Sequence, residues 1–169
     1  MATFVVEDGT GLTTANSYTS VSTATDFISN NIHDTTWVST TNAVKEKVLM
    51  WATQLIDQSV EFFGTKRYED ASLRWPRTGV NDPDGYPYDE DEIPVPLQQA
   101  VAELARLLVI SDRTAEATSR GLKELRVDVI GLVFDKTDRV TLFPPTVTVL
   151  LQSIGRVAVG GRSRKVIRS

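Results

Sequence analysis

The residues best able to do chemistry lie in one stretch, LRWPRTGVNDPDGYPYDEDEIP, at residues 73–94. Its second half holds six carboxylates, and clustered carboxylates suggest a calcium site. If Gly85 takes the sixth position of an EF-hand loop, Val80 takes the first position, and Asp91 takes the twelfth, where Glu is needed. The pattern therefore favours a tight turn at this glycine, with a weak cation site as the alternative.

Other signals of catalysis are few. The chain has one histidine, His33, and no cysteine, so a thiolate metal site or a histidine-based triad cannot be assembled within one chain. The segment GVNDPDG lacks the Lys and the Ser or Thr of a phosphate-binding P-loop. We expect no enzymatic activity, no metal and no cofactor.

Charge is divided unevenly along the chain. The net charge is −4, but no acidic residue follows Arg139, so the last segment carries +5 and the remainder −9. This division indicates a basic tail that binds an acidic partner, with a solvated terminus as the alternative. The basic residues of that tail are Arg156, Arg162, Arg164, Lys165 and Arg168.

Single-stranded nucleic acid is one such partner. Proteins that bind it combine a basic groove with aromatic side chains on which bases stack. The basic tail has no aromatic residue after Phe143, and the aromatic-rich loop is acidic. Trp51 lies on an apolar helical stripe and is assigned to the core. The residues alone therefore leave only the tail for electrostatic contact with DNA.

Hydrophobic periodicity predicts a mainly α fold. We expect helices from Ser20 to about residue 29, over residues 42–59, from Pro96 for about four turns, and briefly after residues 143–145. The apolar face of the second helix should contain Val44, Val48, Trp51, Ala52, Leu55 and Ile56.

The segments between these helices complete the prediction. Residues 1–19 should form an extended arm, residues 31–41 a polar loop, and residues 125–135 a short β element, either one bulged strand or two strands. The whole is a small helical bundle with a long ordered loop and an extended C-terminal tail. We assign residues 1–154 to one domain and 155–169 to the tail. We expect no signal peptide, since the N-terminus has no basic region or long apolar core. No apolar run is long enough to span a bilayer, so we also expect a soluble protein with no membrane partner.

Four motifs follow one another along the chain: ANSYTSVSTATDFI at 15–28, KVLMWATQLID at 47–57, LRWPRTGV at 73–80 and IPVPLQQAVAELA at 93–105. Their order resembles a family of tailed-phage proteins, the head–tail connector or neck adaptors, some of which are titled DnaT-like single-stranded-DNA-binding proteins. The resemblance covers about residues 16–151, and Trp-Pro-Arg followed by Gly-Val is its most specific part.

The resemblance implies a structural adaptor domain without catalysis. Its subunits would form a ring, expected to be a dodecamer, beneath the portal protein of a virion, after assembly in the host cytoplasm. The ring would contact a downstream neck or tail protein, and double-stranded DNA would pass through its channel as cargo.

Site residues follow from this interpretation. Trp75, Pro76 and Trp51 would anchor the loop on the helices. Intersubunit contacts would join Arg74 and Arg77 to Asp89, Glu90, Asp91 and Glu92, and the basic tail would dock on the portal. Two alternatives stay open: a single-stranded-DNA-binding replication accessory protein, and a tail-side completion protein.

Overall fold

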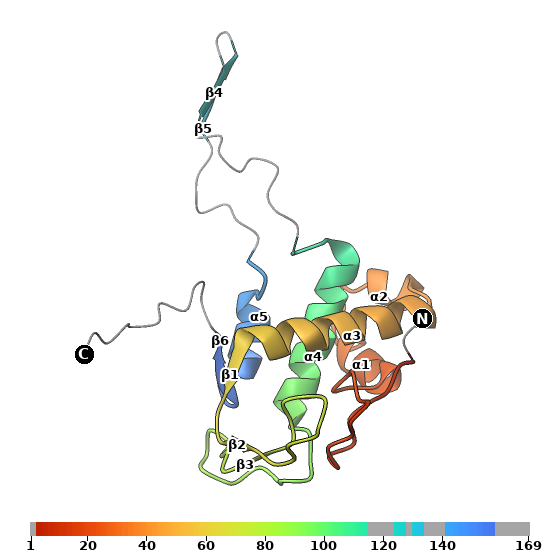
Figure 1. Cartoon of the computed structure of the whole chain (residues 1–169). Coiled ribbons are helices and arrows are strands. Elements are labelled where there is room, and N and C mark those ends of the chain that lie inside the picture. Colours follow the sequence, from red (N-terminus) through yellow and green to blue (C-terminus); the bar gives the residue numbers. More distant parts are fainter. Residues whose placement is uncertain (1–2, 115–123, 128–129, 134–140, 158–169) are drawn as a thin grey trace, which may run out of the picture.

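Helix α4 (Val95–Ile110) lies at the centre of the helical part of the molecule, and α3 (Asn42–Ser59) lies across it (Figure 1). The computed structural model describes residues 3–114, 124–127, 130–133 and 141–157. Three further helices within these residues are α1 (Val21–Ile28), α2 (Thr36–Ser39) and α5 (Pro145–Leu151). This arrangement confirms the mainly helical fold class.

Burial explains the central place of α4. Leu97, Val101 and Leu104 are fully buried, and the alanines between them let neighbouring helices approach closely. Pro96 lies in the first turn, where its missing N–H breaks no intrahelical hydrogen bond. The helix starts within one residue of the predicted position.

Helix α1 begins where the sequence predicts. The hydroxyl oxygen of Ser20 accepts a hydrogen bond from the backbone N–H of Thr23 at 3.0 Å, which caps the helix. The predicted polar loop that follows is interrupted by α2. This short helix is held by Trp37, which is buried and donates its indole N–H to the Thr25 hydroxyl at 3.0 Å.

Helix α3 has its predicted length and buries most of its predicted face, but not all of it. Leu49, Ala52 and Ile56 are fully buried, whereas Val44 and Trp51 are 45% and 41% exposed. The buried face also takes in Lys45, whose ammonium lies 5.4 Å from the centre of the Trp37 ring. The assignment of Trp51 to the core was wrong, because α1 and α4 pack on the side of the helix that carries Leu49, Ala52 and Ile56.

Three small antiparallel sheets accompany the helices. Strand β1 (Val60–Phe62) pairs with β6 (Gly155–Val157), β2 (Thr65–Lys66) with β3 (Arg77–Thr78), and β4 (Glu124–Val127) with β5 (Ile130–Val133). The last pair corresponds to the predicted β element. The first pair shows that the segment assigned to the tail begins as a strand of the fold.

The predicted N-terminal arm folds back on itself. Glu7 is buried, and its carboxylate accepts backbone N–H groups from Gly9, Gly11 and Leu12 at 3.1, 2.8 and 3.0 Å. Gly9 has φ +101°, and a Cβ atom there would collide with the carbonyl of Asp91. The arm is therefore a closed loop packed on the acidic loop rather than an extended segment.

Among the described residues, no helix combines the length and the apolar character that crossing a membrane requires.

Candidate functional site

A groove of about 570 Å³ runs along the outer face of α3. Ala15 and Asn16 of the N-terminal segment and Ser72 and Leu73 of the long loop form its other wall. This volume lies within the range of small-ligand sites. The α3 residues that line it are Lys47, Met50, Trp51, Thr53, Gln54, Asp57 and Gln58.

Four of these residues form one stripe on the helix. Lys47, Trp51, Gln54 and Gln58 are spaced four, three and four residues apart, which places them on the same face. All four are exposed. The chain has three tryptophans, and the other two, Trp37 and Trp75, are 1% and 0% exposed. The groove therefore presents the one indole ring that a ligand can reach.

A buried tyrosine holds the floor of the groove in place. Tyr18 donates its hydroxyl hydrogen to the Oδ1 atom of Asp57 at 2.6 Å, and its oxygen accepts the N–H groups of Arg74 and Trp75 at 3.0 and 3.2 Å. Arg74 N also donates to Asp57 Oδ2 at 3.2 Å. This network fixes the long loop against α3 and so shapes the groove.

Burial governs ionisation in this network. It raises the pKa of the Tyr18 hydroxyl well above 10.0, and the Asp57 carboxylate adds to that effect. Burial also raises the pKa of Asp57 above 3.8, although the hydrogen bonds from Tyr18 and Arg74 oppose the shift. Tyr18 therefore stays protonated and serves as a fixed donor.

Trp75 lies in the core beneath the long loop. Its ring makes edge-to-face contacts with Phe62 and Tyr88, at centroid distances of 6.2 and 6.4 Å. The carbonyl of Pro76 accepts the N–H of Arg67 at 3.0 Å. Trp51, which we expected to anchor this loop, is a groove residue instead.

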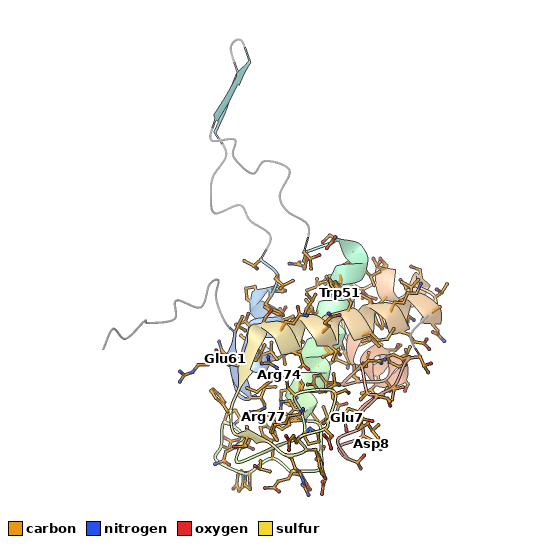
Figure 2. All side chains as sticks on the ribbon, viewed as in Figure 1. Glu7, Asp8, Trp51, Glu61, Arg74 and Arg77 are labelled. Carbon is orange, nitrogen blue, oxygen red and sulfur yellow. The ribbon has the colours of Figure 1, made fainter. Side chains whose placement is uncertain are left out.

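The loop arginines bond to backbone carbonyls of their own chain. Arg77 donates from Nε to Phe63 O at 2.6 Å and from Nη2 to Gly64 O at 2.7 Å, and Arg74 Nη1 donates to Val60 O at 3.2 Å. The guanidinium of Arg156 lies 5.8 Å from the centre of the Phe63 ring. We call Arg74, Arg77 and Arg156 the cationic edge. Figure 2 shows Arg74 and Arg77 nearer than Trp51 to the C-terminal end of α3.

The acidic loop also has partners in its own chain. Arg67 forms ion pairs with Asp91 at 2.9 Å and Glu90 at 3.5 Å, and the Tyr68 hydroxyl donates to Asp91 at 3.1 Å. The Oδ1 atom of Asp89 accepts the N–H of Asp91, in the same loop, at 3.1 Å. The exposed Glu92 carboxylate lines a small hollow beside Val95. Within the described residues of a single chain, these acids therefore do not form ion pairs with Arg74 or Arg77.

The tight turn at Gly85 is present as predicted. Gly85 has φ +91°, and its N–H donates to the carbonyl of Asp82 at 3.0 Å. The Asp82 side chain accepts the N–H groups of Asp84 and Tyr86. In the part of the chain that the structure describes, no three acidic or histidine side chains gather as metal ligands would.

The sequence matches, over residues 2–169, a protein family described as "Putative DnaT-like ssDNA binding protein". The chain belongs to this family. No curated protein and no solved structure matches it.

Membership of the DnaT-like family corrects the interpretation as a head–tail connector. The family description names single-stranded DNA, and no comparison indicates a portal protein, a ring or a neck partner. The connector interpretation gave most weight to the Trp-Pro-Arg loop, whose observed contacts hold the long loop to its own fold. Of the alternatives kept open above, the DNA-binding one agrees with the family.

The sequence prediction missed the groove. Its signal was present in the spacing of Lys47, Trp51, Gln54 and Gln58, in which one aromatic residue shares a helical face with polar residues. Of the basic tail, Arg156 lies on β6, whereas Arg162, Arg164, Lys165 and Arg168 lie outside the described residues.

Proposed function

We propose that the protein binds single-stranded DNA, with one base stacked on Trp51 in the α3 groove. The observation that carries the proposal is the exposed indole ring on a stripe of cationic and amide side chains. The description of the DnaT-like family supports the choice of ligand.

The groove suits an unpaired base. Ala15, Met50 and Leu73 supply apolar surface beside the Trp51 ring. A base that leaves water to stack on an aromatic ring gains about 1–3 kcal/mol, and every base offers a π face. The stacked position therefore serves any sequence, as an accessory protein on single strands requires.

Cations lie at both ends of this groove. Lys47 lies at the end toward the start of α3, and the cationic edge lies beyond its other end, around β1. The side chains of Arg74 and Arg77 stay charged while bonded to carbonyls, so they still attract phosphate. The acidic loop, residues 82–92, contributes no residue to the groove lining. A DNA backbone along α3 thus meets positive charge at both ends.

Fluorescence titration with a short oligo(dT) tests the proposal. Because Trp37 and Trp75 are buried, we expect bound DNA to quench chiefly the emission of Trp51. Trp51→Ala should weaken binding by about five- to a hundredfold, the loss of one stacked base, while Trp51→Phe retains most of the affinity. Binding is measured in parallel by fluorescence anisotropy of a labelled oligonucleotide.

Tyr86→Ala is the matched control, since Tyr86 is an aromatic residue, 71% exposed, in the acidic loop. It should leave the affinity unchanged. Equal affinities for wild type and Trp51→Ala, or no binding of oligo(dT) by wild type, would sink the proposal.

A further inference from the structure

The floor of the groove carries a negative charge, which is unusual for a DNA-binding surface. Among the described residues that line it, Asp57 is the one acid. A carboxylate repels a phosphate but accepts hydrogen bonds from base N–H groups. Asp57 therefore belongs opposite the edge of a base rather than opposite the backbone.

Asp57 keeps free capacity to accept hydrogen bonds. A carboxylate has about four lone-pair sites. Oδ1 accepts one hydrogen bond, from Tyr18, and Oδ2 accepts one, from the Arg74 N–H. The network also holds the side chain still, because both of its donors belong to a segment other than α3.

Two amides lie beside this carboxylate. Gln54 and Gln58 line the same groove, three residues before and one residue after Asp57. Both are exposed, so either can donate to a ring nitrogen or a carbonyl of the same base. The groove that holds the Trp51 ring thus also offers a base one fixed acceptor and two adjustable donors.

The four bases differ in what they offer to such a site. Cytosine, adenine and guanine carry an exocyclic amino group that donates to a carboxylate. Thymine carries none, and its one ring N–H lies between two carbonyl oxygens that a carboxylate repels. Stacking alone does not make this distinction, because it is tolerant of sequence.

We infer that the groove prefers bases with an exocyclic amino group over thymine, and that Asp57 is the residue that determines this preference. The inference rests on the proposed function, since it needs a base stacked on Trp51. It adds a modest base preference to a binding mode that otherwise ignores sequence.

The first test changes only the DNA. Three unlabelled strands of equal length compete against labelled oligo(dT). Each is an oligo(dT) in which the central base is replaced by cytosine, by adenine or by unsubstituted purine, which is adenine without its amino group. We expect cytosine and adenine to raise the affinity by about tenfold or more, the effect of one hydrogen bond to a charged group. Purine should bind as thymine does. Equal binding of adenine and purine overturns the inference.

The second test changes the protein. Asp57→Asn replaces one acceptor by a donor and should abolish the preference for cytosine over thymine while stacking on Trp51 persists. Because this variant also disturbs the Tyr18 network, its fold is checked by circular dichroism and thermal unfolding. Tyr18→Phe keeps the carboxylate but removes one of its two donors, so it should weaken the preference without abolishing it. If Asp57→Asn unfolds, the DNA series decides the matter.

Failure of the inference can be told apart from failure of the proposed function. If oligonucleotides bind and Trp51→Ala weakens them, but the central base makes no difference, the preference is refuted and the DNA-binding proposal stands. If no oligonucleotide binds, both are refuted.

Discussion

Tyr18 links three separate segments of the chain through one hydroxyl group. It reaches Asp57 on α3 and the N–H groups of Arg74 and Trp75 in the long loop. Of these two N–H groups, only that of Arg74 also donates to Asp57. Loss of the hydroxyl therefore leaves the Trp75 N–H buried without this acceptor.

We expect Tyr18→Phe to lower the free energy of unfolding by about 1–3 kcal/mol, the usual cost of leaving a buried polar group unsatisfied. The loss should be larger at neutral than at acid pH, because the Tyr18 hydrogen bond stabilises the charged form of Asp57. Urea unfolding at both pH values measures it. Tyr86→Phe, at an exposed site, is the control; a loss that is the same at both pH values would contradict the account.

The sign of the Asp57 contribution follows from its burial. Its pKa is raised in the folded protein. The group therefore adds stability that is fully present below the unfolded pKa and is lost as the pH rises through the folded pKa. Protonation of Asp57 therefore does not contribute to unfolding in acid. Near neutral pH its ionised carboxylate lowers the free energy of unfolding.

At the scale of elements, α3 serves two purposes with two faces. One face, which includes Leu49, Ala52 and Ile56, packs on the core, and the stripe from Lys47 to Gln58 lines the groove. Strand β1 continues directly from this helix and pairs with β6, which positions Arg156. The helix α3 and the strand β1, which are continuous in the chain, thus hold the groove and the cationic edge in place together.

Gly155 provides a test of that support. A Cβ atom there would lie 2.7 Å from Val60 Cγ1 and 2.9 Å from the carbonyl oxygen of Glu61. Gly155→Val should therefore separate β6 from β1, lower the melting temperature and weaken oligonucleotide binding. Arg156→Ala is the matched control, because it removes the cation but keeps the pairing and should weaken binding without the thermal loss. A Gly155→Val variant as stable as wild type would contradict this view.

Elements specified by neighbouring residues could be predicted from the sequence. Ser20 caps α1 with its own side chain, and Pro96 fits the first turn of α4, so both helix starts were found. Most of the buried face of α3 was predicted, but the exposure of Trp51 was not, since it depends on which side of the helix the rest of the fold covers. The loop around Glu7 depends on contact with the carbonyl of Asp91, which no local rule reveals.

The candidate site was harder to predict than the fold. Apolar periodicity treats every tryptophan as core, yet only tertiary packing separates the buried Trp37 from the exposed Trp51. The Asp57 carboxylate on the floor of the groove is held in position by the hydroxyl of Tyr18, a residue distant from it in sequence. The charges of the tail were readable, because charge depends on composition alone.

For the molecule as a whole, the division of charge suits a protein that follows single strands. Its acidic part limits nonspecific attraction to phosphate, and the segment after Arg139 carries five basic residues and no acidic one. The binding affinity should therefore fall steeply with salt in proportion to the cations that contact phosphates.

A chain ending at Val157 lacks Arg162, Arg164, Lys165 and Arg168 and should show a shallower salt dependence. Each lost phosphate contact lowers the slope of log affinity against log salt by about 0.7, so we expect a change of about 3 if all four contribute. Lys47→Ala should change it by about 0.7. Oligonucleotide titrations across a salt series measure the slopes, and an unchanged slope would exclude the tail from binding.

The pairing of β1 with β6 also constrains how the protein is made. Val60 and Val157 pair although more than half the length of the chain separates them. Contacts of such long range form slowly, because the intervening loop must close first. On the ribosome, α3 and β1 are therefore synthesised well before β6, the strand with which β1 pairs. The cationic edge is completed only after β6 brings Arg156 to it, whereas the residues that line the groove all precede β6 in the chain.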